Sequence, residues 1–259
     1  MKRMINSLRI DLRYMIVSYR FLISCVGLAI VSFLSVSEEI INNGSGSVYT
    51  YYTLYWYQPF YILYLLFSVI PGAVSFCIDW NTKHFRSVLL RSNKRIYAFS
   101  KTSACFIAGF LTTFIGQGLF LLALGIKFPY FIDNGNSTSG GIYTTLMNEQ
   151  NIGVYFLIRI LLQAMAAGFF AVFSLWLSTK ITNYFVVLAS PIILYYFIDN
   201  LFVALRLPTW FMPAKISQGL VKGNGILEIV LYCMCYFLLL GIMFSIAFYL
   251  SSKRRFEHG

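Results

Sequence analysis

The chain has 259 residues, of which 59% are hydrophobic and only 11% are charged, and its mean hydropathy is +0.72. A water-soluble domain of this size needs many more charges to cover its surface, so the composition predicts an integral membrane protein. The net charge of +11 does not indicate a nucleic-acid partner, because basic residues collect in the cytoplasmic segments of membrane proteins whatever their function.

Six apolar stretches are candidates for membrane-spanning helices, since a span needs about 20 mostly apolar residues. They cover residues 21–36, 60–78, 102–126, 152–177, 184–198 and 226–250. The first and the fifth are short, and we expect them to extend by a few residues. The predicted fold class is all-α: a polytopic membrane protein of six transmembrane helices, with residues 1–259 forming a single transmembrane domain.

The basic residues favour one side of this arrangement. One side has Lys2, Arg3, Arg9, Arg13, Arg20, Lys83, Arg86, Arg91, Lys94, Arg95, Lys101, Lys180, Lys253, Arg254 and Arg255, and the other has Lys127, Arg206, Lys215 and Lys222. The positive-inside rule then predicts a multi-pass protein of the cell membrane with both termini in the cytoplasm.

The N-terminal residues 1–20 have the pattern of an amphipathic helix that lies in the membrane surface. At 100° per residue the side chains of Lys2, Arg9, Arg13 and Arg20 fall within about 40° of one another. The apolar side chains fill a separate sector, which comprises Ile5, Leu8, Leu12, Met15, Ile16 and Tyr19. The alternative is a basic N-terminus that is merely solvated.

Tyrosine and other aromatic residues gather around the outer start of the second predicted span. Residues 37–58 and 127–151 would face outward, and the aromatic residues are Tyr49, Tyr51, Tyr52, Tyr55, Trp56, Tyr57, Phe60, Tyr61 and Tyr64. Such rings settle at the level of the lipid headgroups, so we expect them to anchor the protein there. Stacking against a substrate is the alternative role.

The segment 79–101, between the second and third spans, combines six basic residues with an apolar stripe. Phe85, Val88, Leu89 and Ile96 recur at helical spacing, and Asp79, Asn81 or Thr82 can cap the start of a helix. A loop that only sets orientation would explain the charge but not the stripe, which needs a surface to bury against. We therefore expect a short amphipathic helix across the cytoplasmic face that leads into the third span at Lys101.

This layout resembles the membrane-spanning subunits of type-2 ABC export permeases, a family that includes peptide exporters and permeases that clear bacteriocins or lantibiotics from the producer's own membrane. The family has an N-terminal interfacial helix, six spans, and a coupling helix in the loop after the second span. That loop opens with an acid, contains paired leucines and closes with basic, aromatic and lysine positions, here Asp79, Leu89, Leu90, Lys94, Arg95, Tyr97 and Lys101. Lys83 and Asn93 stand where the family commonly has Gly and Pro.

The segment before the sixth span is similar to the family's outer half-helices, which we expect over residues 199–225. Within it, Pro208 and Pro213 exclude a continuous helix, and Gly223 and Gly225 favour an end.

The resemblance implies a bacterial permease that works with two partners, an ABC ATPase subunit and a second permease subunit. The chain has no G-x-x-x-x-G-K-[ST] motif, so ATP and Mg would be bound by the ATPase and no cofactor by this chain. The ATPase would dock on the loop helix, with Phe85, Leu89 and Leu90 as buried anchors and Arg86 and Arg91 as a charged rim. A peptide or other amphiphilic compound is the expected cargo.

Three polar residues inside the spans are candidates for the translocation path. Arg159 lies about 10 Å into the fourth span at 1.5 Å per residue, Gln163 follows one turn later, and Gln117 is in the third span. Arg159 could pair with Glu149, Asp199 or Glu228. The alternative, equally weighted, is that Arg159 extends to the outer headgroups.

Two other classes of protein compete with a transporter subunit. A membrane-embedded enzyme is disfavoured, because the two histidines, His84 and His258, lie outside the spans and no paired carboxylates occur within them. A non-catalytic immunity or sensor protein, which binds an extracellular peptide without an ATPase, fits the same sequence. An ATPase encoded beside this chain would favour the transporter.

Overall fold

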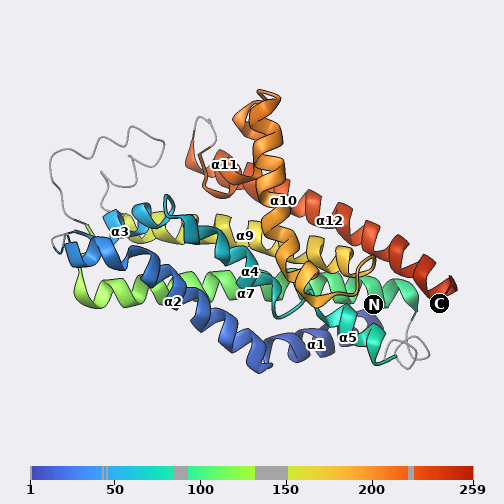
Figure 1. Cartoon of the computed structure of the whole chain (residues 1–259). Helices are drawn as coiled ribbons and strands as arrows, with labels where there is room; N and C mark the ends of the chain where they lie inside the picture. The colour runs from blue at the N-terminus through green and yellow to red at the C-terminus, as the bar shows by residue number, and fades with distance from the viewer. Residues whose placement is uncertain are drawn as a thin grey trace.

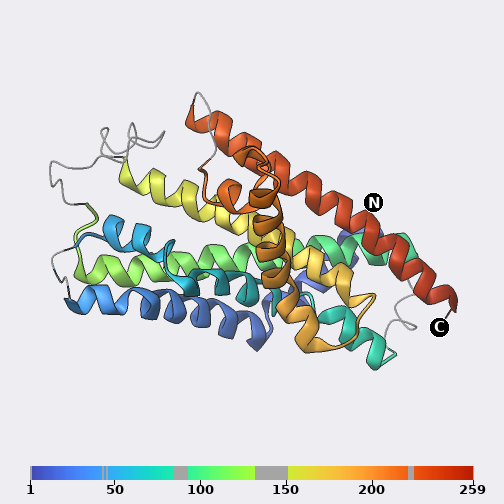
Figure 2. The same ribbon diagram turned by 45° about the horizontal axis from the view of Figure 1, so that its top comes forward.

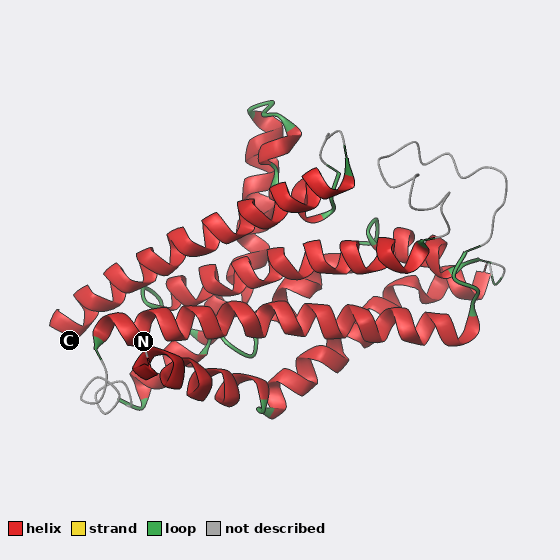
Figure 3. Cartoon of the chain, turned by 180° about the vertical axis from the view of Figure 1, so that it is seen from behind, coloured by secondary structure: helices red, strands yellow, loops and turns green. Residues whose placement is uncertain are grey.

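The computed structural model describes residues 2–42, 44, 46–83, 93–131, 151–220 and 225–258, and the regular structure in these ranges is helical throughout (Figures 1 and 3). The all-α prediction is therefore confirmed for the described part of the chain. The long axis of the molecule follows a bundle of extended helices, with both chain termini near the same end (Figure 1).

Five helices are long and apolar enough to cross a membrane: α2 (Tyr19–Asn42), α7 (Lys94–Lys127), α9 (Ile152–Ser178), α10 (Tyr184–Ala204) and α12 (Ile226–His258). Each contains one of the predicted spans. The structure is thus that of a multi-pass membrane protein with five candidate membrane-spanning helices.

Helix α9 lies at the centre of the bundle. Of its most apolar 18-residue window 83% is buried, against 22% for α10 and for α12, so α9 is covered by protein and the other two present apolar surface outward. Small residues bring α7 close to α9. A Cβ on Gly109 would lie 2.8 Å from the Cβ of Ala171, and a Cβ on Gly168 would lie 3.0 Å from the Phe106 carbonyl oxygen.

The predicted second span, residues 60–78, is not one continuous helix. The segment consists of α3 (Val48–Tyr55), η1 (Pro59–Ile62), α4 (Leu63–Val69) and α5 (Ser75–Asn81), with turns at residues 70–74. The turns contain Pro71, which has no N–H for a helical hydrogen bond. The next residue, Gly72, lets the backbone approach α7, because a Cβ there would meet Cys105 Sγ at 2.7 Å. The interrupted segment still follows α7 from one end of the bundle to the other (Figures 1 and 2).

Helix α7, which contains the third predicted span, begins earlier than the sequence predicts. Residues 94–101, which we assigned to the loop before the third span, form the first turns of α7. With 34 residues α7 is about 51 Å long, well beyond the roughly 30 Å of a hydrocarbon core, so it extends into the surface region. Of the predicted coupling helix over 79–101, the described residues 79–81 belong to α5 and residues 94–101 to α7. The centre of the predicted helix, residues 84–92, lies outside the described residues.

Helix α1 (Lys2–Ile16) packs against these first turns of α7. Met15 is 1% exposed and joins Tyr97, Ala98 and Cys105 in a second hydrophobic core cluster, on which Leu8 and Leu12 also pack. The opposite side of α1 exposes Arg9 and Arg13. We call the part of the molecule that contains α1, α5, the first turns of α7 and both termini the basic end.

Helix α10 leaves the bundle at a steep angle (Figures 1 and 3) and is followed by two short helices, η2 (Thr209–Phe211) and α11 (Pro213–Ser217). The prolines thus have the predicted effect of preventing a continuous helix before α12. Gln218 caps the C-terminus of α11, and its carbonyl oxygen accepts a hydrogen bond from Arg159 of α9.

Candidate functional site

A buried cluster of aromatic and polar side chains occupies the half of the bundle away from the basic end. Helix α3 supplies its first face, because Val48, Tyr51, Tyr52 and Tyr55 have the i, i+3, i+4, i+7 spacing of one side of a helix and are each at most 1% exposed. Ser47 begins the helix, since its Oγ accepts a hydrogen bond from the Thr50 amide at 3.2 Å.

The prediction that these rings sit at the lipid headgroups is wrong for most of them. The buried rings are those of Tyr51, Tyr52, Tyr55, Trp56, Tyr61 and Tyr64. The breaks around η1 fold this part of the chain back onto α7 and α9, so the rings pack inside the protein. Among these rings, those of Tyr57 and Phe60 have the exposure that an interfacial anchor needs, at 85% and 56%.

Arg159 points into this cluster. Its residue is 7% exposed, its guanidinium carbon lies 4.6 Å from the centre of the Trp56 ring, and its Nη1 donates a hydrogen bond to the Gln218 carbonyl oxygen. A guanidinium over a desolvated indole face is a favourable cation–π arrangement, worth about 2 kcal/mol. The described structure therefore has this side chain facing inward, rather than extended to the outer headgroups.

Gln117 connects three elements at the floor of the cluster. It is fully buried on α7, and its Nε2 donates to Tyr55 Oη at 3.0 Å and to Ser32 Oγ of α2 at 3.3 Å. Tyr55 in turn donates to the Tyr61 carbonyl oxygen at 3.3 Å. One amide thus joins α2, α7 and the interrupted segment.

Gln163 lies one turn from Arg159 on α9 and is fully buried. Its side chain comes near the Tyr55 hydroxyl. However, neither Nε2 nor Oε1 forms a hydrogen bond with any described residue. Gln163 thus places a buried amide beside Tyr55.

Helix α10 is joined to the cluster through tyrosines. The hydroxyl of Tyr61, in η1, is hydrogen-bonded to the hydroxyl of Tyr195, in α10. The Tyr61 ring stacks on Tyr64 with centroids 5.7 Å apart. The three candidate residues Arg159, Gln163 and Gln117 thus belong to one cluster, to which α2, α7, α9 and α10 contribute. It offers aromatic faces, amide groups and one cation, which are groups that bind amphiphilic molecules.

The basic end contains a second polar cluster, which joins the two ends of the predicted docking segment. Asp79, in α5, forms a salt bridge with Lys101, and its Oδ2 accepts a hydrogen bond from the Tyr97 hydroxyl at 2.9 Å. The two charged side chains are 15% and 5% exposed. We call the contacts of Asp79 with Tyr97 and Lys101 the clasp. The predicted docking residues Phe85, Arg86, Leu89, Leu90 and Arg91 lie outside the described residues, between its two halves.

Helix α1 attaches beside the clasp through a partly buried acid. The Ser100 hydroxyl donates a hydrogen bond to Asp11. Burial raises the pKa of the Asp11 carboxyl above its ordinary value of 3.8, although nearby Lys101 and the Ser100 hydrogen bond act in the opposite direction. The uncharged form of Asp11 is therefore favoured by its position.

The end of α12 attaches on the other side of the clasp. Arg255 Nη1 donates to the Thr179 carbonyl oxygen at 2.6 Å, just beyond the end of α9, and its guanidinium lies 4.3 Å from the centre of the Trp80 ring. A cation at a helix C-terminus is favourable. Helices α5, α7, α9 and α12 are therefore held together at the basic end.

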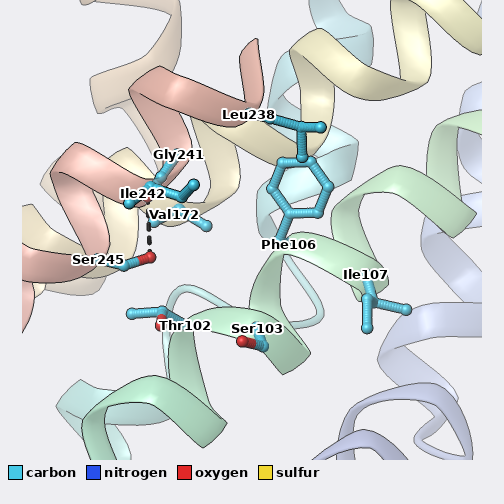
Figure 4. A pocket seen from close by; sticks show the side chains of 9 residues that line it. All are labelled: Thr102, Ser103, Phe106, Ile107, Val172, Leu238, Gly241, Ile242 and Ser245. Atoms are coloured by element: carbon cyan, nitrogen blue, oxygen red, sulfur yellow. Dashed lines mark hydrogen bonds between the residues drawn. The ribbon is translucent and has the colours of Figure 1, made fainter. Parts of the chain in front are cut away.

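A hollow of about 240 Å³ opens between α7, α9 and α12 (Figure 4). It is mostly apolar, and the Ser245 hydroxyl within it donates to the Gly241 carbonyl oxygen of its own helix at 2.8 Å. None of the predicted site residues lines it. The described residues contain no group of three or more His, Cys, Asp or Glu side chains that could hold a metal ion.

The part that α3 plays in the cluster was not predicted from the sequence. The helical spacing of Val48, Tyr51, Tyr52 and Tyr55 was the available signal, and it predicts one buried face in place of scattered interfacial rings. The role of Gln218 had no such signal, because its backbone carbonyl, and not its side chain, receives Arg159.

No family model, curated protein or solved structure matches this chain.

Proposed function

We propose that the chain is the permease subunit of an ATP-driven exporter, in which a separate ATPase binds and hydrolyses ATP. The interrupted segment α3–α5 is the sixth pass through the membrane, and both termini are cytoplasmic. The positive-inside distribution of Lys and Arg supports this orientation, because the termini, α5 and the first turns of α7 lie at one end of the bundle.

The clasp is the observation that carries the proposal. A buried charged pair stabilises a protein only when its geometry is good. This pair ties the beginning of the docking segment to its end. The two described elements on either side of residues 84–92, α5 and the first turns of α7, are therefore held together. A partner that binds residues 84–92 applies its force directly to α5 and α7.

The interrupted segment provides a route by which such a force reaches the polar and aromatic cluster. Helix α5 leads through the turns at 70–74 to α4, and α4 continues from η1, whose Tyr61 touches both Tyr55 and Tyr195. Short helical pieces joined by turns can shift as separate bodies, unlike a single long helix. In the proposed cycle, ATP-driven closure of the ATPase moves α5 and opens the cluster around Arg159 and Gln163 to a peptide or other amphiphile.

A second permease subunit is part of the proposal, because α10 presents a large apolar surface outside the bundle. Its exposed side chains include Phe185, Ile193, Phe197 and Val203, with exposed fractions of 59% or more. In a membrane, helices associate through packing and hydrogen bonds, and α10 brings a steeply crossing surface of this kind. This face is the proposed contact with a second copy or a related subunit.

The test is co-purification from native membranes. The variant Phe85→Ala/Arg86→Ala/Leu89→Ala should lose an associated ATPase and still insert in the membrane. Lys180→Ala/Ile181→Ala is the matched control, since it also removes a cation and an apolar side chain from an exposed connection between helices. An ATPase that stays bound to the triple variant at the wild-type level overturns the proposed docking site.

The same experiment distinguishes the alternative function, a membrane immunity or sensor protein that binds an extracellular peptide without an ATPase. That function is supported if the wild-type chain purifies from native membranes without any ATPase and still protects cells from a peptide.

A further inference from the structure

A hollow of about 450 Å³ lies at the basic end, separate from both polar clusters. It is lined by Arg20, Ile70, Val74, Ile78, Tyr184 and Leu188. These residues come from the start of α2, from the interrupted segment at its turns and α5, and from the first turns of α10. Two of these residues, Ile70 and Val74, belong to the turns at residues 70–74.

The hollow has one cation on an otherwise apolar wall. Arg20 lies in the first turn of α2, where the positive end of the helix dipole adds to its charge. Its guanidinium carbon is 5.8 Å from the centre of the Tyr19 ring, and it forms no ion pair with a carboxylate in the described ranges of the chain. A cation in this position favours an anionic group from outside the protein.

Tyr184 offers a hydrogen-bond donor on another wall of the hollow. Asn81 Nδ2 donates to Tyr184 Oη at 3.0 Å, so the tyrosine oxygen acts as the acceptor in that bond. The hydroxyl hydrogen of Tyr184 is then available for a second acceptor, such as a phosphate oxygen. Arg20 and Tyr184 together form the polar rim of the hollow.

The apolar wall extends away from this rim. Leu188 lies one turn beyond Tyr184 on α10, about 6 Å along the helix axis. Ile70 and Val74 flank the turns around Pro71, where the interrupted segment is no longer helical. A ligand that matches the hollow therefore combines an anionic head with a hydrocarbon chain.

We propose that this hollow binds one anionic phospholipid, with its phosphate against Arg20 and Tyr184 and an acyl chain against Ile70, Val74 and Leu188. Anionic lipids are enriched in the cytoplasmic leaflet, where basic pockets between membrane helices bind their headgroups. The bound lipid links the start of α10 to α2 and to α5. This site requires a bilayer and does not require an ATPase, so it can be tested independently of the proposed function.

The experiment uses the full chain, purified in detergent and stripped of lipid, to which dioctanoyl phosphatidylglycerol is added. Bound lipid is counted by native mass spectrometry, and the rise in melting temperature is measured in parallel. We expect Arg20→Gln to weaken binding about tenfold, as for the loss of one charge-assisted hydrogen bond. Arg13→Gln is the control, because it removes the same charge from an exposed position on α1, outside the hollow.

A second pair of variants tests the acyl-chain wall while it keeps the charge. Leu188→Trp should fill the hollow and reduce lipid binding, whereas Val186→Trp, on the same helix but outside the hollow, should not. Equal binding by Arg20→Gln and Arg13→Gln would overturn the proposal. Equal stabilisation by dioctanoyl phosphatidylcholine would overturn the anionic headgroup, and equal stabilisation by glycerol 3-phosphate would overturn the acyl-chain contact.

Discussion

Separating the two charges of the clasp should destabilise the protein measurably. Lys101 is 4% exposed as a residue, so Asp79→Asn leaves a buried ammonium without its carboxylate. Breaking a buried pair in this way costs about 3–5 kcal/mol, and the 15% exposure of the Asp79 side chain places the expected cost near the lower limit. About 3 kcal/mol corresponds to a fall in melting temperature of about 6–12 °C for a domain of this size.

The partner variant and the double variant make the test specific to the pair. In Lys101→Met the remaining charge is that of Asp79, which is more exposed to water than Lys101 and stays hydrogen-bonded to Tyr97. The loss of stability should therefore be smaller, about 1–2 kcal/mol. Asp79→Asn/Lys101→Met removes both charges of the pair and should lose less than the sum of the single losses. The assay is thermal unfolding of the three variants in one detergent. Strictly additive losses would refute the coupling of the two side chains.

Three further predictions concern packing, protonation and hydrogen bonding. Gly109→Ala should destabilise the protein by about 1–3 kcal/mol, because the added Cβ would collide with α9. Gly118→Ala should stabilise it by about 0.5–1 kcal/mol, because the added Cβ meets nothing within 4 Å. The opposite ranking in thermal unfolding would contradict the α7–α9 contact. Burial raises the pKa of Asp11, so the charged carboxylate opposes folding once the pH rises above the raised value. Asp11→Asn should therefore stabilise the protein at pH 7 and lose this advantage as the pH falls towards 3.8. A difference in stability between variant and wild type that stays the same from pH 7 to pH 4 would contradict the burial of Asp11. Tyr55→Phe should cost about 1–2 kcal/mol, because the buried Gln117 amide loses an acceptor, and an unchanged melting temperature would contradict that bond.

Hydropathy alone predicted the positions of the five long helices, because the bilayer core requires long apolar stretches of helix. It did not predict their ends. Helix α7 begins at Lys94, eight residues before the apolar stretch, since Tyr97, Ser100 and Lys101 find buried partners in α1 and α5. Such partners come from distant parts of the chain, so no local pattern reveals them.

The interrupted segment illustrates a different limit. Pro191 lies within α10, which continues through it, whereas the turns around Pro71 interrupt the predicted second span. Proline is tolerated in membrane helices where neighbours satisfy the freed backbone groups, so the residue type alone does not decide between the two outcomes. At Pro71 the following Gly72 and its contact with Cys105 accompany the break.

The candidate site was predicted in part. The spacing of Arg159 and Gln163 places them on one side of α9, and both are buried, as expected for polar residues that avoid lipid. Gln117 meets them through Tyr55, and this contact depends on residues 48–64 folding back into the bundle. The inward direction of Arg159 depends on Trp56 and Gln218, which are distant from it in the sequence.

The most direct test of the proposed function is a cross-link from the docking segment in intact native membranes. A photo-reactive amino acid placed at the position of Leu89 should capture a protein that carries the G-x-x-x-x-G-K-[ST] motif of an ATPase, and the same amino acid at the position of Ile181 should not. Capture of lipid alone from the Leu89 position, in cells that export or resist the cargo normally, would contradict the account.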